Sequence, residues 1–201
     1  MAVNGFSQDG LRKIWRDIEN SIQSLSGAEY YEKWGSLRED FYAKYGPLDV
    51  PELDKNKVRG LKNAYKGNRI FIMGNGPSLN DTPLEALKHE YTFGANRVYL
   101  LNDRVDWKPT FYTALDWRVV PDIAREMNGL TGSMFFFEER FRGILREGND
   151  VFYYTHNGAP KNSGQSKFSF DVDQGVRGAG SVVGSAIQIA FFMGFDPIYL
   201  I

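Results

Sequence analysis

One short stretch restricts the possible folds of this chain more than any other: an apolar run followed at once by a glycine-rich turn. Residues 69–80 read Arg-Ile-Phe-Ile-Met-Gly-Asn-Gly-Pro-Ser-Leu-Asn. The apolar run at 70–73 is typical of a strand buried on both faces of a parallel sheet. Gly74 and Gly76 let the backbone turn sharply and let an anionic group approach its N–H groups. The stretch predicts a phosphate-binding turn, although an ordinary strand-to-helix turn can have the same composition.

A helix is expected soon after this turn. Thr82, Pro83 and Glu85 have the spacing of a capping box with proline at the first helical position. The stretch lacks both the third glycine of the dinucleotide fingerprint and the Gly-Lys-Ser/Thr ending of a P-loop. The turn therefore matches neither of these two nucleotide-binding motifs.

Composition narrows the class of protein. The 201 residues suit one α/β domain with an appendage, and 15 Phe with 11 Tyr provide a large aromatic core. A formal net charge of −1 gives no sign of a nucleic-acid partner, and the absence of cysteine excludes disulfides and thiolate sites. The start of the chain does not resemble a secretion signal, and the longest apolar stretch, residues 186–195, is too short to span a bilayer. We expect a cytoplasmic protein with no transmembrane segment.

Two regions are expected along the chain. Residues 1–66 form a helical N-terminal segment, because apolar side chains recur at helical spacing in 7–25 and 28–45. Residues 67–201 form an α/β domain with a mostly parallel, Rossmann-like sheet and flanking helices. Its further strands are predicted at 92–95, 111–115, 132–137, 151–155 and, as another buried strand, 197–201. Its helices are predicted at 119–127 and 182–193, the charged residues 138–142 as a solvated helix face, and 156–173 as a long loop.

Polar residues follow several of these strands, where ligands bind in open parallel sheets. Asn96 can hydrogen-bond a nucleotide or cap its own backbone. Asp116 can hold Mg²⁺, bind a ribose hydroxyl or act as a base, or it can cap the following helix. His156, beside the long loop, is a further acid/base candidate.

A second glycine-rich segment, Gly178-Ala179-Gly180-Ser181, precedes the buried helix. Gly180 and Ser181 lie at the helix N-terminus, where N–H groups and the helix dipole favour an anion. Arg177 can add a phosphate contact. Close packing of the helix explains Gly184 but not the glycines that come before it.

The two glycine segments, Asn96, Lys108-Pro109-Thr110 with Asp116, and the ending Phe-Met-Gly-Phe-Asp-Pro-Ile-Tyr-Leu-Ile together resemble the MptE-like family. Its named activity is that of a 6-hydroxymethylpterin diphosphokinase, a Rossmann-like enzyme that moves diphosphate from ATP. The Gly-x-Gly-Pro-Ser-Leu opening and the Gly/Ser-rich helix are also similar to bacterial sialyltransferases that use a CMP-sugar. The resemblance covers about residues 66–201.

The resemblance implies a nucleotide held between the two glycine segments. Its implied contacts are Gly74, Asn75, Gly76, Pro77 and Ser78 for phosphates, Asn96 for ribose or base, and Gly180 with Ser181 for the other phosphate side. Asp116 is the implied catalytic residue and Mg²⁺ ligand.

Three functions follow from these implied contacts. The first is a transferase that moves diphosphate from ATP to a hydroxyl acceptor such as a hydroxymethylpterin. The alternatives are a glycosyltransferase with a nucleotide-sugar donor in surface polysaccharide synthesis and a non-catalytic nucleotide-binding module. Because the sequence stops at an apolar strand, we expect it to be part of a longer chain whose later residues complete the site.

Overall fold

The computed structural model divides the chain into two compact units, Met1–Glu52 and Leu53–Ile201. The described residues are 55–116, 119–157, 168–178 and 180–201, with scattered positions between 10 and 44. Most of the predicted N-terminal helices at 7–25 and 28–45 lies outside the described residues, and the described positions there are helical. No helix among the described residues combines the length and apolar character that crossing a membrane requires.

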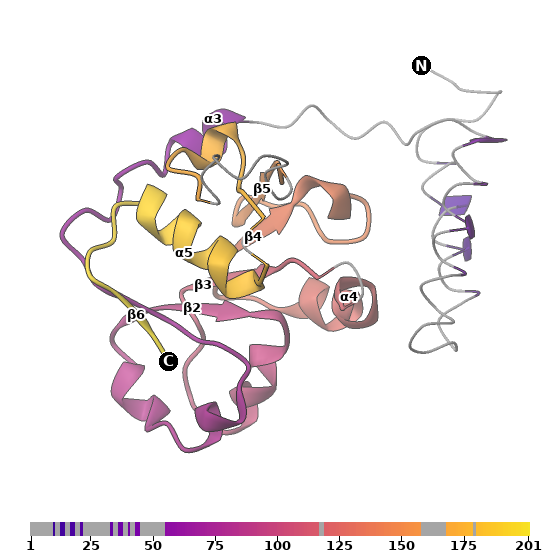
Figure 1. Ribbon diagram of the computed structural model, residues 1–201. Coiled ribbons are helices and arrows are strands. Elements are labelled where there is room, and N and C mark those ends of the chain that lie inside the picture. The colour runs from indigo at the N-terminus through magenta and orange to yellow at the C-terminus, as the bar shows by residue number, and fades with distance from the viewer. Residues whose placement is uncertain are drawn as a thin grey trace. The chain divides into compact units, whose positions relative to one another are not determined.

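The second unit is built on a six-stranded sheet in the order β5-β4-β3-β2-β1-β6, with every neighbouring pair parallel. The strands are β1 (Ile70–Ile72), β2 (Tyr91–Ala95), β3 (Phe111–Ala114), β4 (Met134–Glu138), β5 (Val151–Tyr154) and β6 (Ile198–Leu200). Each strand lies where an apolar run predicts one. The Rossmann-like α/β fold class is therefore confirmed (Figure 1).

In the described part of the second unit, three α-helices and five 3-10 helices precede or connect the strands. The α-helices are α3 (Lys55–Arg59), α4 (Val120–Gly129) and α5 (Val182–Phe192). The 3-10 helices are η1 (Pro77–Asn80), η2 (Leu84–Leu87), η3 (Asn96–Asp103), η4 (Glu139–Phe141) and η5 (Val172–Gln174).

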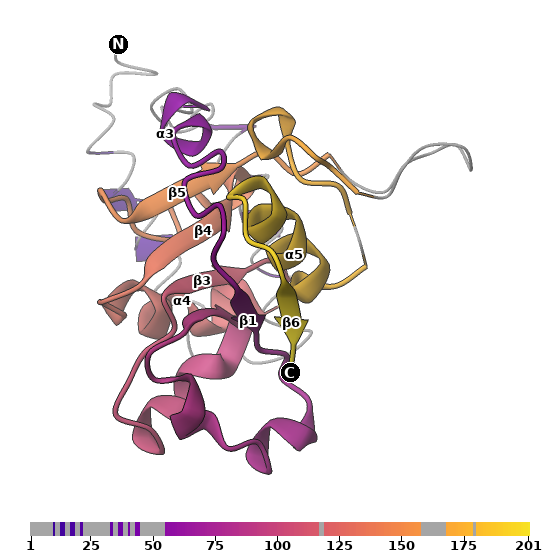
Figure 2. The same cartoon turned by 90° about the vertical axis from the view of Figure 1, so that its left-hand side faces the viewer.

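Each face of the sheet has its own hydrophobic core, because side chains alternate along every strand. Ile70 and Ile72 join the core beneath α5, which α3 completes with Val58. Met73 joins the opposite core, which includes the buried side of α4. Figure 2 shows α5 on one side of the sheet and α4 on the other.

The parallel arrangement gives the sheet two distinct edges. All strands end at one edge, here called the carboxyl edge, and all begin at the other, the amino edge. Helix α5 leads through a short turn into β6, so it runs against the strands and its N-terminus lies at the carboxyl edge. The chain adds β2 to β5 on one side of β1 and then returns to place β6 on the other side. Ligands in such sheets bind at the carboxyl ends of strands beside this change of direction, which here means at β1.

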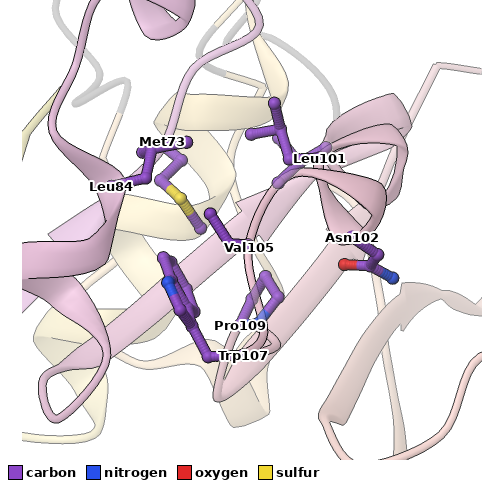
Figure 3. A pocket seen from close by; sticks show the side chains of 8 residues that line it. Met73, Leu84, Leu101, Asn102, Val105, Trp107 and Pro109 are labelled. Carbon is purple, nitrogen blue, oxygen red and sulfur yellow. The ribbon is translucent and has the colours of Figure 1, made fainter.

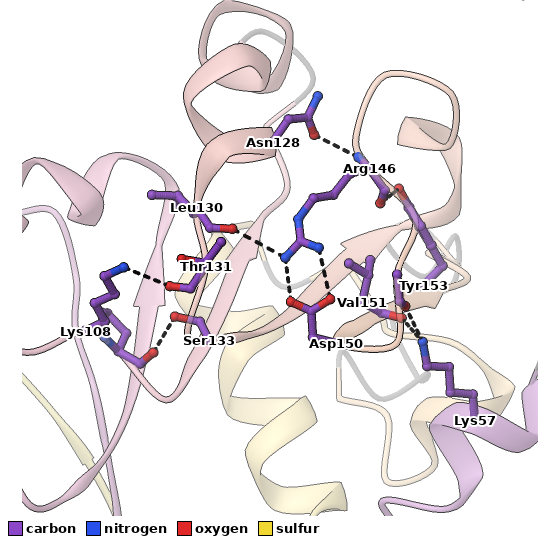
Figure 4. A network of polar contacts seen from close by, with 12 residues as sticks. Lys57, Lys108, Asn128, Leu130, Thr131, Ser133, Arg146, Asp150, Val151 and Tyr153 are labelled. Carbon is purple, nitrogen blue, oxygen red and sulfur yellow. Dashed lines mark hydrogen bonds and ion pairs between the residues drawn. The ribbon is translucent and has the colours of Figure 1, made fainter.

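Hydrogen bonds tie polar groups together at the amino edge (Figure 4). The Arg146 guanidinium forms a two-pronged ion pair with Asp150, with N–O distances of 2.9 and 2.6 Å. The Ser133 hydroxyl donates to the carbonyl of Pro109 at 2.6 Å. The Lys57 ammonium donates to two carbonyls beside β5. These bonds hold the starts of β3, β4 and β5 and the helix α3.

Three local predictions are wrong. The capping box fails because the Thr82 hydroxyl donates to the Ser78 carbonyl at 3.1 Å instead of capping a helix. The N-cap position of η2 is occupied by Pro83, with no side-chain cap. Residues 138–142 are no solvated helix face, because Glu138 ends β4 as a buried carboxylate paired with Arg140. Strand β6 is not buried: Tyr199 and Leu200 are 43% and 60% exposed at the edge of the sheet.

Candidate functional site

The first glycine corner, residues 74–78, leaves β1 at the carboxyl edge and enters η1. The Gly74 N–H donates to the carbonyl of Ile201 at 2.9 Å, so this donor is already used. Residues 75–78 are exposed, and within the described residues the N–H groups of Asn75 and Gly76 make no backbone hydrogen bond. The donors of this corner that can meet an anion are therefore those of Asn75 and Gly76.

The fold itself does not require glycine at this corner. Gly76 has φ −69° and ψ 154°, which any residue adopts, and Gly74 has no positive φ either. A Cβ added to Gly74 would lie 3.6 Å from the nearest atom, and one added to Gly76 would lie 3.5 Å away. These are ordinary van der Waals distances. Close approach of another molecule is a remaining physical reason for glycine at both positions.

Asn96 lies directly after β2, beside this corner. The Asn75 amide donates to the Ala95 carbonyl at 3.1 Å, which joins the corner to the end of β2. Asn96 has φ +47°, and its carbonyl accepts a hydrogen bond from the buried Tyr112 hydroxyl, which also accepts from Tyr99 N–H at 3.0 Å. Burial raises the pKa of Tyr112, so this hydroxyl stays protonated and able to donate. The Asn96 side-chain oxygen is buried and has no hydrogen-bond partner among the described residues.

Asp116 lies two residues beyond β3 and is exposed. Helix α4 has Val119, with no side-chain cap, at its N-cap position, and the Asp116 carbonyl accepts from the N–H groups of Val119 and Val120. Asp116 therefore does not cap α4 with its side chain. Metal binding or catalysis by its carboxylate at the carboxyl edge stays a prediction.

The second glycine corner, residues 178–181, leads into α5 at the same edge. Ser181 is the N-cap, and its hydroxyl accepts from the Gly184 N–H at 3.1 Å. Gly180 has φ +75°, a conformation that alone explains the glycine. The buried Gln188 side chain bonds both the N–H and the carbonyl of Arg177 at 3.0 Å and so fixes the entry to this corner. Ala179 lies outside the described residues.

Sequence reasoning missed a group of buried polar side chains at this edge. Thr113, Tyr154 and Ser185, here called the hydroxyl cluster, are 0%, 1% and 0% exposed. By strict geometry none of their hydroxyls forms a hydrogen bond among the described residues, but Thr113 and Ser185 lie close enough to the Tyr154 hydroxyl to act as its hydrogen-bond partners. Glu138 is 5% exposed and lies opposite Tyr154 on the neighbouring strand. Each of these residues sits in or beside an apolar run, so the pattern alone reads as core.

The pKa values of Tyr154 and His156 are shifted by burial and by neighbouring polar and charged side chains. Burial raises the pKa of Tyr154 far above its ordinary value, and the nearby Thr113 and Ser185 hydroxyls offset part of that rise. His156 follows β5, pairs with Val176 through a β-bridge and is half-buried. Burial lowers its pKa, while the Glu138 carboxylate raises it and Arg140 lowers it. The imidazole is therefore neutral near pH 7 and can accept a proton.

Two cavities lie away from these residues. The first, behind the first glycine corner (Figure 3), has a volume of about 10 Å³, enough for roughly one water. Met73, Leu84, Val98, Leu101, Asn102, Val105, Trp107 and Pro109 line it. The second is an open groove of about 640 Å³ beside the start of β6, at the amino edge. Neither cavity suits a nucleotide at the end of β1, the first because of its size and the second because of its place.

The structure thus joins the first glycine corner through a hydrogen bond to Ala95, the residue before Asn96. Topology brings Asp116, His156 and Ser181 to the same edge. The two corners lie toward opposite faces of the sheet: η1 packs on the α4 side through Leu79, and α5 covers the other side. The two corners therefore share an edge of the sheet but not a face, and contact of one nucleotide with both corners stays a prediction.

Comparison with known proteins places the chain in a family. No curated protein sequence matches it. A solved structure of the MAf glycosyltransferase from Magnetospirillum magneticum AMB-1 is similar over 94% of this chain, with 17% identity and a TM-score of 0.44. This chain spans only 35% of that structure's length, and so loose a likeness carries no inference about activity.

A family model described as 6-hydroxymethylpterin diphosphokinase MptE-like matches residues 49–201, which include every strand and both glycine corners. A diphosphokinase is a transferase, so the match supports a transferase-like function in general terms. Since the matched region is well over half of the sequence, this chain belongs to the MptE-like family.

Proposed function

We propose that this protein is a nucleotide-dependent transferase that moves diphosphate from ATP to a hydroxyl acceptor such as 6-hydroxymethylpterin. The observation that carries the proposal is the first glycine corner, where neither backbone conformation nor packing calls for Gly74 or Gly76. Exposed N–H groups at the end of β1 are suited to phosphate oxygens. The family description names the same class of reaction.

The roles of the residues follow from their places. Asn75 and Gly76 donate backbone N–H groups to the phosphates, and Asn96 offers its unpartnered side-chain oxygen to a ribose or base donor. The acceptor oxygen attacks the β-phosphorus, the bond between that phosphorus and the α-phosphate oxygen breaks, and AMP leaves. The acceptor proton passes to a base, for which neutral His156 is our candidate. Gly180 and Ser181 face the phosphates from the α5 side.

Magnesium belongs to this proposal through Asp116. The described residues contain no group of three possible metal ligands. Mg²⁺ is often bound by one or two carboxylates together with substrate phosphates, so a single strand-end carboxylate fits that pattern. Bound there, Mg²⁺ would supply charge neutralisation on the phosphates.

The proposal is tested by thermal unfolding and calorimetry of the full chain with ATP, CMP, UDP and GDP, each with and without Mg²⁺. ATP is expected to raise the melting temperature most. Gly76→Ala should weaken ATP binding at least tenfold at unchanged stability, because its Cβ occupies the space a phosphate needs. Gly129→Ala is the matched control at the other end of the sheet, since its Cβ would meet nothing within 4 Å.

The outcomes separate the alternatives. Preference for CMP or UDP would favour a nucleotide-sugar donor and thus a glycosyltransferase. ATP binding without AMP release in the presence of 6-hydroxymethylpterin would favour a non-catalytic nucleotide-binding module or a different acceptor. Binding of none of the four nucleotides would contradict the proposal.

A further inference from the structure

We propose that Arg97 is a phosphate-binding residue of the same site and holds the part of ATP that is transferred, the β- and γ-phosphates. The inference rests on the proposed transferase function and adds a cation to it, since the first glycine corner offers the phosphates only backbone N–H groups. Arg97 follows Asn96 directly after β2, at the carboxyl edge. Its side chain is 48% exposed, so a ligand can reach the guanidinium.

Arg97 lies on the same face of the sheet as the first glycine corner. A hydrogen bond of 3.1 Å joins the corner to the Ala95 carbonyl, two residues before Arg97. The helix η3, which contains Arg97, and the helix η1 pack into the same core on the α4 side, through Val98 and Leu79. Strands β1, β2 and β3 are neighbours, about 4.8 Å apart. The corner, Arg97 and Asp116 therefore follow three adjacent strands in that order.

The ion pair that Arg97 makes within the fold is a loose one. Its guanidinium lies 3.7 Å from the Asp122 carboxylate, beyond hydrogen-bond distance. The other seven ion pairs of the described residues have N–O separations of 3.0 Å or less. Asp122 is in the first turn of α4, where the helix dipole already stabilises a carboxylate. An exposed pair of this kind contributes little to stability, so the guanidinium can turn to a phosphate.

The Tyr99 hydroxyl is a second neighbour of the guanidinium. Burial and the Glu126 carboxylate raise the pKa of Tyr99, and Arg97 offsets part of that rise. The phenol therefore stays neutral near pH 7 and does not compete with a phosphate as a charged partner. Both neighbours leave the positive charge of Arg97 available for an anionic ligand.

Other arginines near this edge are engaged or lie on the opposite face. Arg140 is paired with a buried carboxylate. Arg104, directly after η3, donates to the side chain and to the backbone carbonyl of Asn80 at 2.6 and 3.0 Å. The backbone of Arg177 is bonded to α5, on the face away from the first corner. Of these four arginines, Arg97 is the one that combines the right face with a loosely held guanidinium.

The charge of the ligand explains why a cation is needed here. The β- and γ-phosphates carry most of the negative charge of ATP, and a planar guanidinium can bind two phosphate oxygens at once. Further negative charge builds up on the α-phosphate oxygen as its bond to the β-phosphorus breaks. An arginine between the first corner and Asp116 is placed to offset these charges.

The first test measures the binding of ATP, AMP and inorganic triphosphate, each with Mg²⁺, by calorimetry of the full chain. Arg97→Gln should weaken ATP and inorganic triphosphate at least tenfold and AMP less than twofold, because AMP lacks the β- and γ-phosphates. Arg125→Gln removes the same charge from an exposed position of α4 and should change each affinity less than twofold. Equal losses in the two variants, or an equal loss of AMP and ATP in Arg97→Gln, would overturn the proposal.

The second test asks whether Arg97 acts on the ligand or only on Asp122. Asp122→Asn breaks the same ion pair but keeps the guanidinium, so ATP affinity should stay the same or rise up to threefold. A loss in Asp122→Asn as large as that in Arg97→Gln would show that the ion pair has a structural role, and it would overturn the proposal.

Inorganic triphosphate separates this inference from the proposed function. Binding of inorganic triphosphate that depends on Arg97, without binding of ATP, would overturn the proposed function but keep the phosphate contact. ATP binding that Arg97→Gln leaves unchanged would overturn the role of Arg97 alone. A wild-type protein that binds neither ATP nor inorganic triphosphate would overturn both.

Discussion

The two edges of one parallel sheet handle buried polar groups in opposite ways. At the amino edge, Ser133, Thr92 and the Arg146–Asp150 pair find partners within the fold, while the Arg146 Nε and, just before β3, the Trp107 Nε1 have none among the described residues. At the carboxyl edge, the side-chain oxygen of Asn96 has no partner among the described residues, and the hydroxyls of Thr113, Tyr154 and Ser185 contact only one another, without ideal geometry. The two edges therefore differ in how their buried polar groups are paired, and the carboxyl edge is the one that carries the proposed binding site.

Two buried serines test this contrast with the largest expected effect. Ser133→Ala removes the donor to the Pro109 carbonyl and should lower the free energy of unfolding by about 1–3 kcal/mol. Ser185→Ala removes a hydroxyl whose partner is the Tyr154 hydroxyl, without ideal geometry, so the loss of stability should be smaller. Urea unfolding of both variants measures the difference, and equal losses would break the distinction between the edges.

Two asparagines with positive φ provide the next test. Asn96→Gly keeps the left-handed backbone at φ +47° without strain but removes the side-chain oxygen. We expect nucleotide affinity to fall about tenfold, the worth of one good hydrogen bond, with stability unchanged. Asn63→Gly, at φ 59° near the amino edge, is the matched control and should leave affinity unaltered. Equal affinity in both variants would remove Asn96 from the site.

Much of this architecture is predictable from local sequence. The strands are apolar runs bounded by Gly, Pro or polar residues, and a parallel sheet brings their ends to one edge, so Asn96 and Asp116 could be placed there in advance. The hydroxyl cluster could not, because Thr113 and Tyr154 each stand among aromatic and small apolar neighbours that look like core. Their hydroxyls meet one another and that of Ser185 inside the core, a contact that depends on packing between segments far apart in the chain.

The local errors have the same origin. Thr82 has the residue spacing of a capping box, but its hydroxyl bonds back to Ser78, because the chain forms short 3-10 turns here instead of an α-helix. Glu138 belongs to a charged run, but its strand continues one residue further and carries it into the interior. In both cases the local sequence is compatible with two structures, and the packing of the folded chain determines which of them forms.

A smaller effect is expected from the ion pair at the amino edge. The Arg146 guanidinium holds the pKa of Asp150 below its usual value through their hydrogen bonds. The stabilisation is present above the unfolded-state pKa of about 3.9 and is lost as the pH falls through the lower folded-state value. Because Asp150 is partly exposed, Asp150→Asn should cost only about 0.2–1 kcal/mol at pH 7.

Unfolding of wild type and Asp150→Asn in urea at pH 7 and pH 3 checks this ion pair. The gap between the two proteins should narrow at the lower pH, and nucleotide affinity at pH 7 should be the same in both. A variant that loses nucleotide binding while staying folded would show that the amino edge also takes part in binding.

The smallest effect concerns His156, whose environment links the carboxyl edge to its buried carboxylate. Burial lowers the pKa of His156, so we expect its NMR titration midpoint below the ordinary value of about 6.5. Glu138→Gln removes the charge that favours the imidazolium and should lower the midpoint further. His89→Gln assigns the signal, since the chain has two histidines. A midpoint that does not respond to Glu138→Gln would separate His156 from the cluster, and the proposed proton acceptor would then have to be sought elsewhere at this edge.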